Sequence, residues 1–140
     1  MDSTGSASTP PRVLVILPEQ WPRALIRAEL RESGYDALGA RDLSEALSYA
    51  AAEPGRGPVR LVVVDQGAAG ASGDAALAEL FARHGDPMAV LVARPGPVTD
   101  AGRWREILRR PLRIGAIVEV VRTLLPLPRS GELDSAMPHG

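Results

Sequence analysis

The sequence predicts an α/β fold in which a five-stranded parallel sheet carries helices on both faces. Short apolar runs rich in β-branched residues alternate along the chain with segments of helical periodicity, and turn-forming residues separate them. One run, residues 61–64, reads Leu-Val-Val-Val without a polar interruption, as expected of a strand buried on both faces. Alternating strands and helices imply right-handed crossovers and a parallel sheet.

The composition fits one soluble domain and excludes several kinds of chemistry. The chain has 140 residues, of which 45% are hydrophobic, and its net charge of −1 gives no bulk attraction to nucleic acid or to an anionic membrane. It has no cysteine and no lysine, which excludes disulfides, thiolate zinc sites, Schiff-base chemistry and a P-loop lysine. We expect no cofactor, no resident metal and no nucleic-acid or membrane partner. The first residues lack the apolar core of a signal peptide, so we expect a cytoplasmic protein.

The predicted domain covers residues 12–125, between a disordered arm at 1–11 and a flexible tail at 126–140. The expected strands cover residues 13–17, 35–38, 59–64, 88–93 and 105–108. The expected helices cover residues 22–33, 42–51, 72–84 and 114–125.

Local signals support the first half of this assignment. Pro22 suits the first turn of a helix, and Gly34 ends that helix in the usual way. Asp42 and Glu45 have the spacing of a capping box, so they predict the start of the second helix. The turn-rich residues 54–58 predict a break before the third strand.

The second half is predicted in the same way. Ser72 is a plausible cap for the third helix, and Gly85 ends it. Residues 94–103 contain two prolines and two glycines, so the fourth helix should be short or absent. The simplest arrangement of these elements is a flavodoxin-like, doubly wound, three-layer αβα fold with strand order 2-1-3-4-5.

Asp65 is the main candidate for a functional side chain in such a fold. It ends the buried third strand, and the functional crevice of an open parallel sheet lies at the carboxyl ends of its strands. His84 lies on an apolar helical stripe and Ser72 has no catalytic partners in its neighbourhood, while His139 is in the tail. No glycine-rich phosphate-binding fingerprint follows the first strand. We therefore do not expect an enzyme.

Several positions in register resemble the response-regulator receiver family, over about residues 12–125. They are the first strand, the turn Ser33-Gly34-Tyr35, Asp65 at the end of its strand, Gly73 eight residues later, and Arg110-Pro111-Leu112. The last of these is similar to the Lys-Pro-Phe of the family, with arginine in place of lysine. The resemblance implies a signalling module of two-component phosphorelays, with Asp65 at the phosphoacceptor position.

The departures from the family imply a degenerate, pseudo-receiver member. The acidic pair that holds Mg²⁺ in typical receivers corresponds here to Leu17 and Pro18, and the serine or threonine after the fourth strand corresponds to Ala93. Together with Glu19, Arg110 and Pro111, these residues should line the Asp65 crevice.

Two roles are possible for the Asp65 side chain. It can be a phosphoacceptor, or it can be a strand-end carboxylate paired with Arg110. Phosphoryl transfer needs charge neutralisation that Mg²⁺ normally supplies, and a lone carboxylate does not build a tight Mg²⁺ site. We therefore favour the ion pair, although Glu19 is a candidate for a displaced metal ligand.

A basic cluster around the fifth strand is the predicted partner-binding surface. It comprises Arg103, Trp104, Arg105, Arg109 and Arg113. We expect an acidic surface of a signalling protein, such as a histidine kinase, to bind there, and a homodimer through the fifth strand and last helix is a further option. The predicted function is phosphorylation-independent signalling by protein–protein contact. The alternatives are an atypical phosphoacceptor receiver that uses Asp65 and a small flavodoxin-like ligand-binding domain or enzyme.

Overall fold

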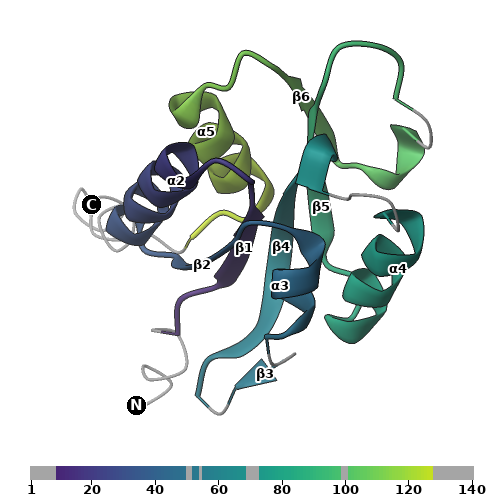
Figure 1. Cartoon of the computed structure of the whole chain (residues 1–140). Helices are drawn as coiled ribbons and strands as arrows, with labels where there is room; N and C mark the ends of the chain where they lie inside the picture. The colour runs from purple at the N-terminus through teal and green to yellow at the C-terminus, as the bar shows by residue number, and fades with distance from the viewer. Residues whose placement is uncertain (1–8, 50–51, 54, 69–72, 99–100, 128–140) are drawn as a thin grey trace.

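The computed structural model describes residues 9–49, 52–53, 55–68, 73–98 and 101–127. Its centre is a sheet whose parallel strands lie in the order β2-β1-β4-β5-β6 (Figure 1). These strands are β1 (Arg12–Ile16), β2 (Asp36–Ala40), β4 (Gly57–Asp65), β5 (Met88–Ala93) and β6 (Glu106–Arg109). Counted along the chain, they have the predicted order 2-1-3-4-5, so the flavodoxin-like fold class is confirmed.

Helices cover both faces of the sheet and give three layers (Figure 1). Helices α2 (Gln20–Ser33) and α5 (Ile114–Leu124) lie on one face, and α3 (Leu43–Leu47) and α4 (Gly73–Arg83) lie on the other. Successive side chains of β1 point to opposite faces, so Val13 and Val15 join the core under α2 and α5, whereas Leu14 and Ile16 join the core under α3 and α4.

The local helix signals act as predicted. Gly34 ends α2 with a φ of 111°, a left-handed conformation that glycine adopts without steric cost. Asp42 caps α3 by accepting a hydrogen bond from the Glu45 amide at 2.9 Å. The Glu45 carboxylate in turn accepts from the Arg41 amide at 2.8 Å, one residue before the N-cap, so Glu45 also helps to hold the start of α3.

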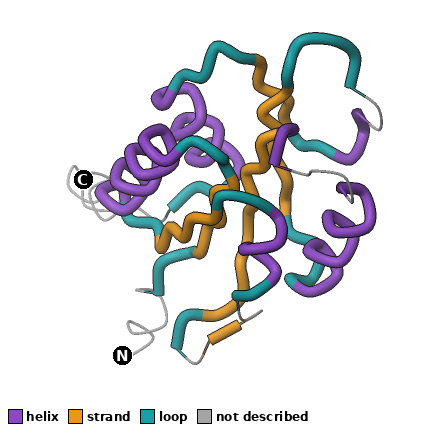
Figure 2. The backbone as a smooth tube through the Cα atoms, viewed as in Figure 1, coloured by secondary structure: helices purple, strands orange, loops and turns teal. Residues whose placement is uncertain are grey.

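The segment after α3 differs from the prediction. The helix ends at Leu47, although the alanine-rich sequence predicted it to continue to residue 51; residues 50–51 themselves lie outside the described ones. A short strand, β3 (Ala52–Glu53), pairs antiparallel with the beginning of β4, so β4 starts at Gly57 and not at residue 59 (Figure 2). Gly55 and Gly57 adopt positive φ angles in the connection between β3 and β4, a conformation that glycine allows without steric cost.

The connection between β5 and β6 also matters for the site. Its described residues contain one short 3-10 helix, η2 (Ala101–Arg103), and no α-helix, as predicted. The predicted cap Ser72 lies outside the described residues. At the end of the domain, Leu127 packs on the core, and the Tyr35 hydroxyl donates to Leu125 O at 2.6 Å, so packing extends beyond the predicted boundary at residue 125.

No helix among the described residues is long and apolar enough to cross a bilayer.

A charged side chain is buried at the amino-terminal ends of the strands. Arg12 is 1% exposed, donates from Nη1 to Gly57 O at 2.8 Å, and lies 3.4 Å from the Asp36 carboxylate through Nε. Arg56 binds the same carboxylate at 2.7 and 2.9 Å. The hydrogen bond from Arg56 is the main reason that the pKa of Asp36 lies below its usual value.

Replacing Asp36 by alanine should destabilise the fold by about 3 kcal/mol, because it leaves the buried Arg12 charge without its carboxylate. Arg56→Ala is the matched control and should cost less than about 1 kcal/mol, since Arg56 is half exposed. Urea unfolding measures both.

The stabilisation that the Asp36 carboxylate provides should depend on pH. Because the folded-state pKa of Asp36 is lowered, its contribution is complete above the unfolded pKa and is lost as the pH falls through the folded value. The stability difference between wild type and Asp36→Ala should therefore shrink below about pH 4. Equal losses in the two variants at neutral pH would contradict the assignment.

Candidate functional site

Four charged side chains meet at the carboxyl edge of the sheet. Asp65 is the last residue of β4, Arg94 follows β5, Arg110 follows β6, and Glu19 lies between β1 and α2. Carboxyl ends of parallel strands share one edge, so the topology alone brings these four positions together. The charges of the four side chains sum to zero.

Asp65 is fully buried, and donors contact both of its oxygens. Its Oδ1 accepts from Arg110 Nη2 at 2.7 Å and from Arg110 Nε at 3.3 Å. Its Oδ2 accepts from the Gly67 amide at 2.8 Å and lies 3.7 Å from Arg94 Nη2. A buried carboxylate requires such partners, because an unpaired charge inside a protein is very costly.

Arg110 also binds a second carboxylate. Its Nη2 donates to Glu19 Oε1 at 3.0 Å, so one guanidinium bridges Asp65 and Glu19. This hydrogen bond from Arg110 is the main cause that lowers the pKa of Glu19. The hydrogen bonds to Asp65 and then to Glu19 raise the pKa of Arg110. Glu19 occupies the N-cap position of α2, but its side chain makes no cap hydrogen bond.

Sequence reasoning missed Arg94 and Gly67. The Arg94 guanidinium lies directly over Gly67, where an added Cβ would be 1.8 Å from Arg94 Nη2. The Arg94 amide donates to Gln66 Oε1 at 2.7 Å, so the turns after β4 and β5 are joined. One signal could have found Arg94, since it follows a buried strand directly, as Asp65 ends one.

Solved structures show which known proteins share this fold. The chain is similar to a response regulator receiver protein from Pseudomonas putida, with a TM-score of 0.65, 22% identity and coverage of 81% of this chain and 97% of that one. A response regulator receiver domain protein from Methanospirillum hungatei gives a TM-score of 0.67 at 14% identity, with 83% and 94% covered. The chain has the receiver fold.

The fold is also found in other contexts. A structure titled adenylate cyclase from Rhodopirellula baltica matches with a TM-score of 0.67 and 14% identity, over 81% of this chain and 86% of that one. No protein-family model and no curated protein matches the sequence. At these identities the likeness establishes the receiver fold, and the chemistry has to be argued from the side chains.

The remaining predicted crevice residues lie at or just after the carboxyl ends of β1, β5 and β6. Leu17 is fully buried, and its side chain belongs to the core beneath α2 and α5. Pro18 is exposed, and its carbonyl, like that of Leu17, lies within hydrogen-bond distance of Arg23 Nη1. Ala93 is buried at the end of β5, and Pro111 is exposed after a cis peptide bond.

The predicted partner-binding residues differ in the contacts that they make. Trp104 packs edge-on against Phe81, with ring centroids 6.2 Å apart, and the Arg103 guanidinium lies 5.7 Å from the same ring. Arg109 donates from Nη1 to the carbonyls of Arg94 and Gly96, at 3.1 and 2.6 Å, and thereby holds the loop after β5. Arg105 and Arg113 are exposed, and no side-chain hydrogen bond or ring contact is described for either of them.

The buried pair at the centre of the site makes a quantitative prediction. Asp65→Ala and Arg110→Ala should each lower the free energy of unfolding by about 1–3 kcal/mol, because each leaves a charge without its main partner. The double variant should lose less than the sum, since the second substitution removes a group that is already unpaired.

Denaturant unfolding of the four proteins measures this cycle. Gly67→Ala is a useful control, because it displaces the flexible Arg94 guanidinium and keeps the Asp65–Arg110 pair. Strictly additive losses would show that the two side chains do not interact in solution.

Proposed function

We propose that this chain is a receiver-type signalling module that works without phosphorylation of Asp65 and acts through protein–protein contact. The observation that carries the proposal is the arginine bridge. Arg110 occupies Oδ1 of Asp65, and the Gly67 amide and Arg94 approach Oδ2. Both oxygens that could attack phosphorus are therefore already engaged.

Charge neutralisation supports the same proposal. In phosphoryl transfer, a divalent cation normally joins the acceptor carboxylate to other carboxylates and offsets the charge of the transferred group. Here the guanidinium of Arg110 joins Asp65 to Glu19 and supplies positive charge at that place. Mg²⁺ requires near-octahedral oxygen ligation, and Leu17 and Pro18 contribute no carboxylate to it.

Incubation with acetyl phosphate and Mg²⁺ should leave the mass of the protein unchanged, because Asp65 is held by arginines and lacks the acidic pair. Intact-mass spectrometry measures the result. Gain of one phosphoryl group, absent in Asp65→Ala, would establish the alternative of an atypical phosphoacceptor and would overturn the proposal.

Signalling must then pass through a protein surface, and the module would act in the cytoplasm on an acidic partner such as a histidine kinase. Within the basic cluster, Arg105 and Arg113 are exposed and have neither a side-chain hydrogen bond nor a ring contact among the described residues. Exposed arginines of this kind steer and anchor acidic partners.

Capture of a partner from a lysate of the source cell should distinguish the Arg105–Arg113 surface from the Asp65 crevice. Arg105→Glu with Arg113→Glu should abolish capture of the partner, because both changes reverse charge without removing a described internal contact. Asp65→Asn should leave capture within about twofold of wild type. The opposite pattern would assign function to the Asp65 crevice.

A further inference from the structure

β2 and β6 are the two outer strands of the sheet. They differ in whether side chains hydrogen-bond to the backbone groups that point away from the sheet. Every second residue of an edge strand directs its N–H and C=O away from the sheet, and these groups can pair with another chain. Proteins commonly blunt such edges with side chains. Among the described residues, side chains bind the outward carbonyls of β2, and no group hydrogen-bonds to the outward backbone atoms of β6.

On β2 the outward residues are Ala37 and Gly39, because Asp36 and Ala40 hydrogen-bond toward β1. Both outward carbonyls accept hydrogen bonds from side chains. The donors are Arg27 Nε and Arg31 Nη2 to Ala37 O, at 3.3 and 3.2 Å, and the Tyr49 hydroxyl to Gly39 O. This edge therefore offers no carbonyl row to a second strand.

On β6, the last backbone hydrogen bond to β5 shows which residues direct their backbone groups outward. Arg110 N donates to Ala93 O at 3.4 Å, and Ala93 lies opposite Arg109 in the register. Backbone direction alternates along a strand, so Leu108 faces β5, whereas Ile107 and Arg109 direct their N–H and C=O outward. Within the described part of the chain, no group hydrogen-bonds to these outward atoms.

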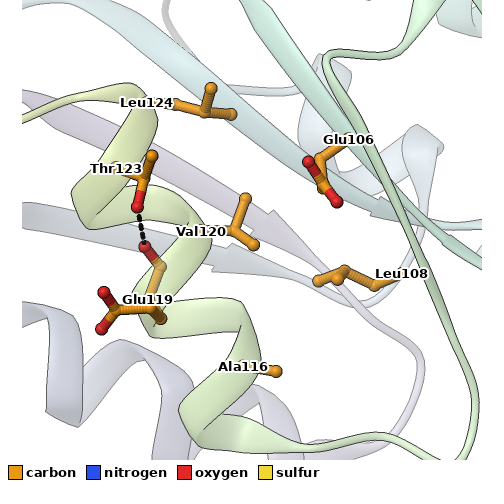
Figure 3. Close-up of a pocket in the computed structure, with 7 residues that line it drawn as sticks. All are labelled: Glu106, Leu108, Ala116, Glu119, Val120, Thr123 and Leu124. Atoms are coloured by element: carbon orange, nitrogen blue, oxygen red, sulfur yellow. Dashed lines mark hydrogen bonds between the residues drawn. The ribbon is translucent and has the colours of Figure 1, made fainter.

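An apolar groove lies beside this open edge, between β6 and α5 (Figure 3). Its volume is about 320 Å³. The lining residues are Glu106, Leu108, Ala116, Glu119, Val120, Thr123 and Leu124. Leu108, Val120 and Leu124 are only partly buried, so a strand added next to β6 would cover apolar surface as well as backbone groups.

The charged side chains on and near β6 indicate which charges would suit a strand that pairs with it. On the groove side, the exposed carboxylates of Glu106 and Glu119 favour a basic residue next to an apolar one. On the opposite face, Ile107 lies two residues before the exposed Arg109, which favours an acidic residue beside an apolar one. Opposite charges placed across neighbouring strands are stabilising.

We propose that β6 receives an extended peptide segment of a partner protein as an additional strand. Backbone groups of Ile107 and Arg109 would hold the segment, and its alternate side chains would fill the β6–α5 groove. Main-chain bonds of this kind supply affinity, and pockets for alternate side chains supply specificity. The inference rests on the proposed function in one respect, namely that the module acts by protein contact, and it specifies the conformation and charge pattern of the partner.

A second copy of this chain fits the edge less well. On the groove side, the β6 strand of a second copy presents Glu106 beside Leu108. It would bring a carboxylate to a rim that already carries Glu106 and Glu119, where a basic side chain is favoured. Self-association is therefore an outcome to be excluded and not the proposal.

The test uses the full chain and a synthetic peptide, acetyl-Lys-Asp-Val-Val-Leu-Asp-Lys-amide, whose alternating faces carry the required pattern. Calorimetry should show saturable 1:1 binding with a dissociation constant below about 1 mM. The peptide with lysines and aspartates exchanged is the matched control and should bind at least about tenfold more weakly. No saturable binding, or equal binding of both peptides, would overturn the proposal.

Two N-methylated peptides test strand addition directly. Methylating the amides of every odd residue blocks one edge of the peptide, and methylating every even residue blocks the other. One peptide should lose binding at least about tenfold and the other should retain it. Equal effects would show that the peptide does not bind as a strand.

Amide exchange and groove variants locate the contact. Added peptide should protect the outward amides of Ile107 and Arg109 and leave those of Ala37 and Gly39 unchanged. Ala116→Arg should block binding, whereas Ala28→Arg on exposed α2 should not. Protection at β2, or loss with Ala28→Arg only, would contradict the placement. Sedimentation of the protein alone should show a monomer, and a dimer that the peptide does not dissociate would assign the edge to a second copy.

The experiment separates the two proposals. Peptide binding should be the same in Asp65→Asn as in wild type, because the open edge does not include the crevice. Phosphorylation of Asp65 together with peptide binding would overturn the proposed function alone. An unreactive Asp65 without peptide binding would overturn the strand-addition proposal alone.

Discussion

The Asp65 carboxylate has no contact with solvent, and its charge has to be balanced inside the protein. Arg110 does most of this, and in doing so it connects the end of β4 to the segment after β6. Through Glu19 it also fixes the turn between β1 and α2. One guanidinium thus holds three separate turns at the carboxyl edge of the sheet, and the other features of that edge are arranged around it.

The same constraint shapes the loop after β5. Arg94 reaches Asp65 only because Gly67 leaves room for its guanidinium, and Arg109 holds the loop by its carbonyls at Arg94 and Gly96. Arginine keeps its charge at all ordinary pH values and binds in a fixed planar geometry. A crevice built from arginines therefore favours a fixed ion cluster over a site that changes with a transferred group, and this supports the proposal of contact through another surface.

The sheet edges suggest where that surface lies. The arginines of α2 that cover β2 also lie against Gly39, where an added Cβ would meet Arg27 at 2.7 Å, so the blunted edge depends on a residue without a side chain. At the other side, the described connection before β6 contains only a 3-10 helix. The open backbone of β6, the apolar groove and the exposed Arg105 are thus neighbours, which links the basic cluster to the proposed strand addition.

The sequence by itself determined the layered fold. Hydrophobic periodicity, the capping box at Asp42 and the glycine at position 34 are local signals, and local signals predict elements and their order well. It also placed Asp65 at the carboxyl end of its strand and indicated Arg110 as its ion-pair partner, since both positions follow from strand ends in a parallel sheet.

Only the tertiary structure decided the remaining points. The β3 hairpin, the position of Leu17 in the core, the contact of Arg94 with Asp65 and the packing of Trp104 on Phe81 all depend on residues that are distant along the chain. Whether an arginine is exposed or holds a carbonyl, and which strand edge stays open, is set by three-dimensional packing. A linear pattern does not contain that information, because it fixes which face a side chain points to and not what stands opposite it.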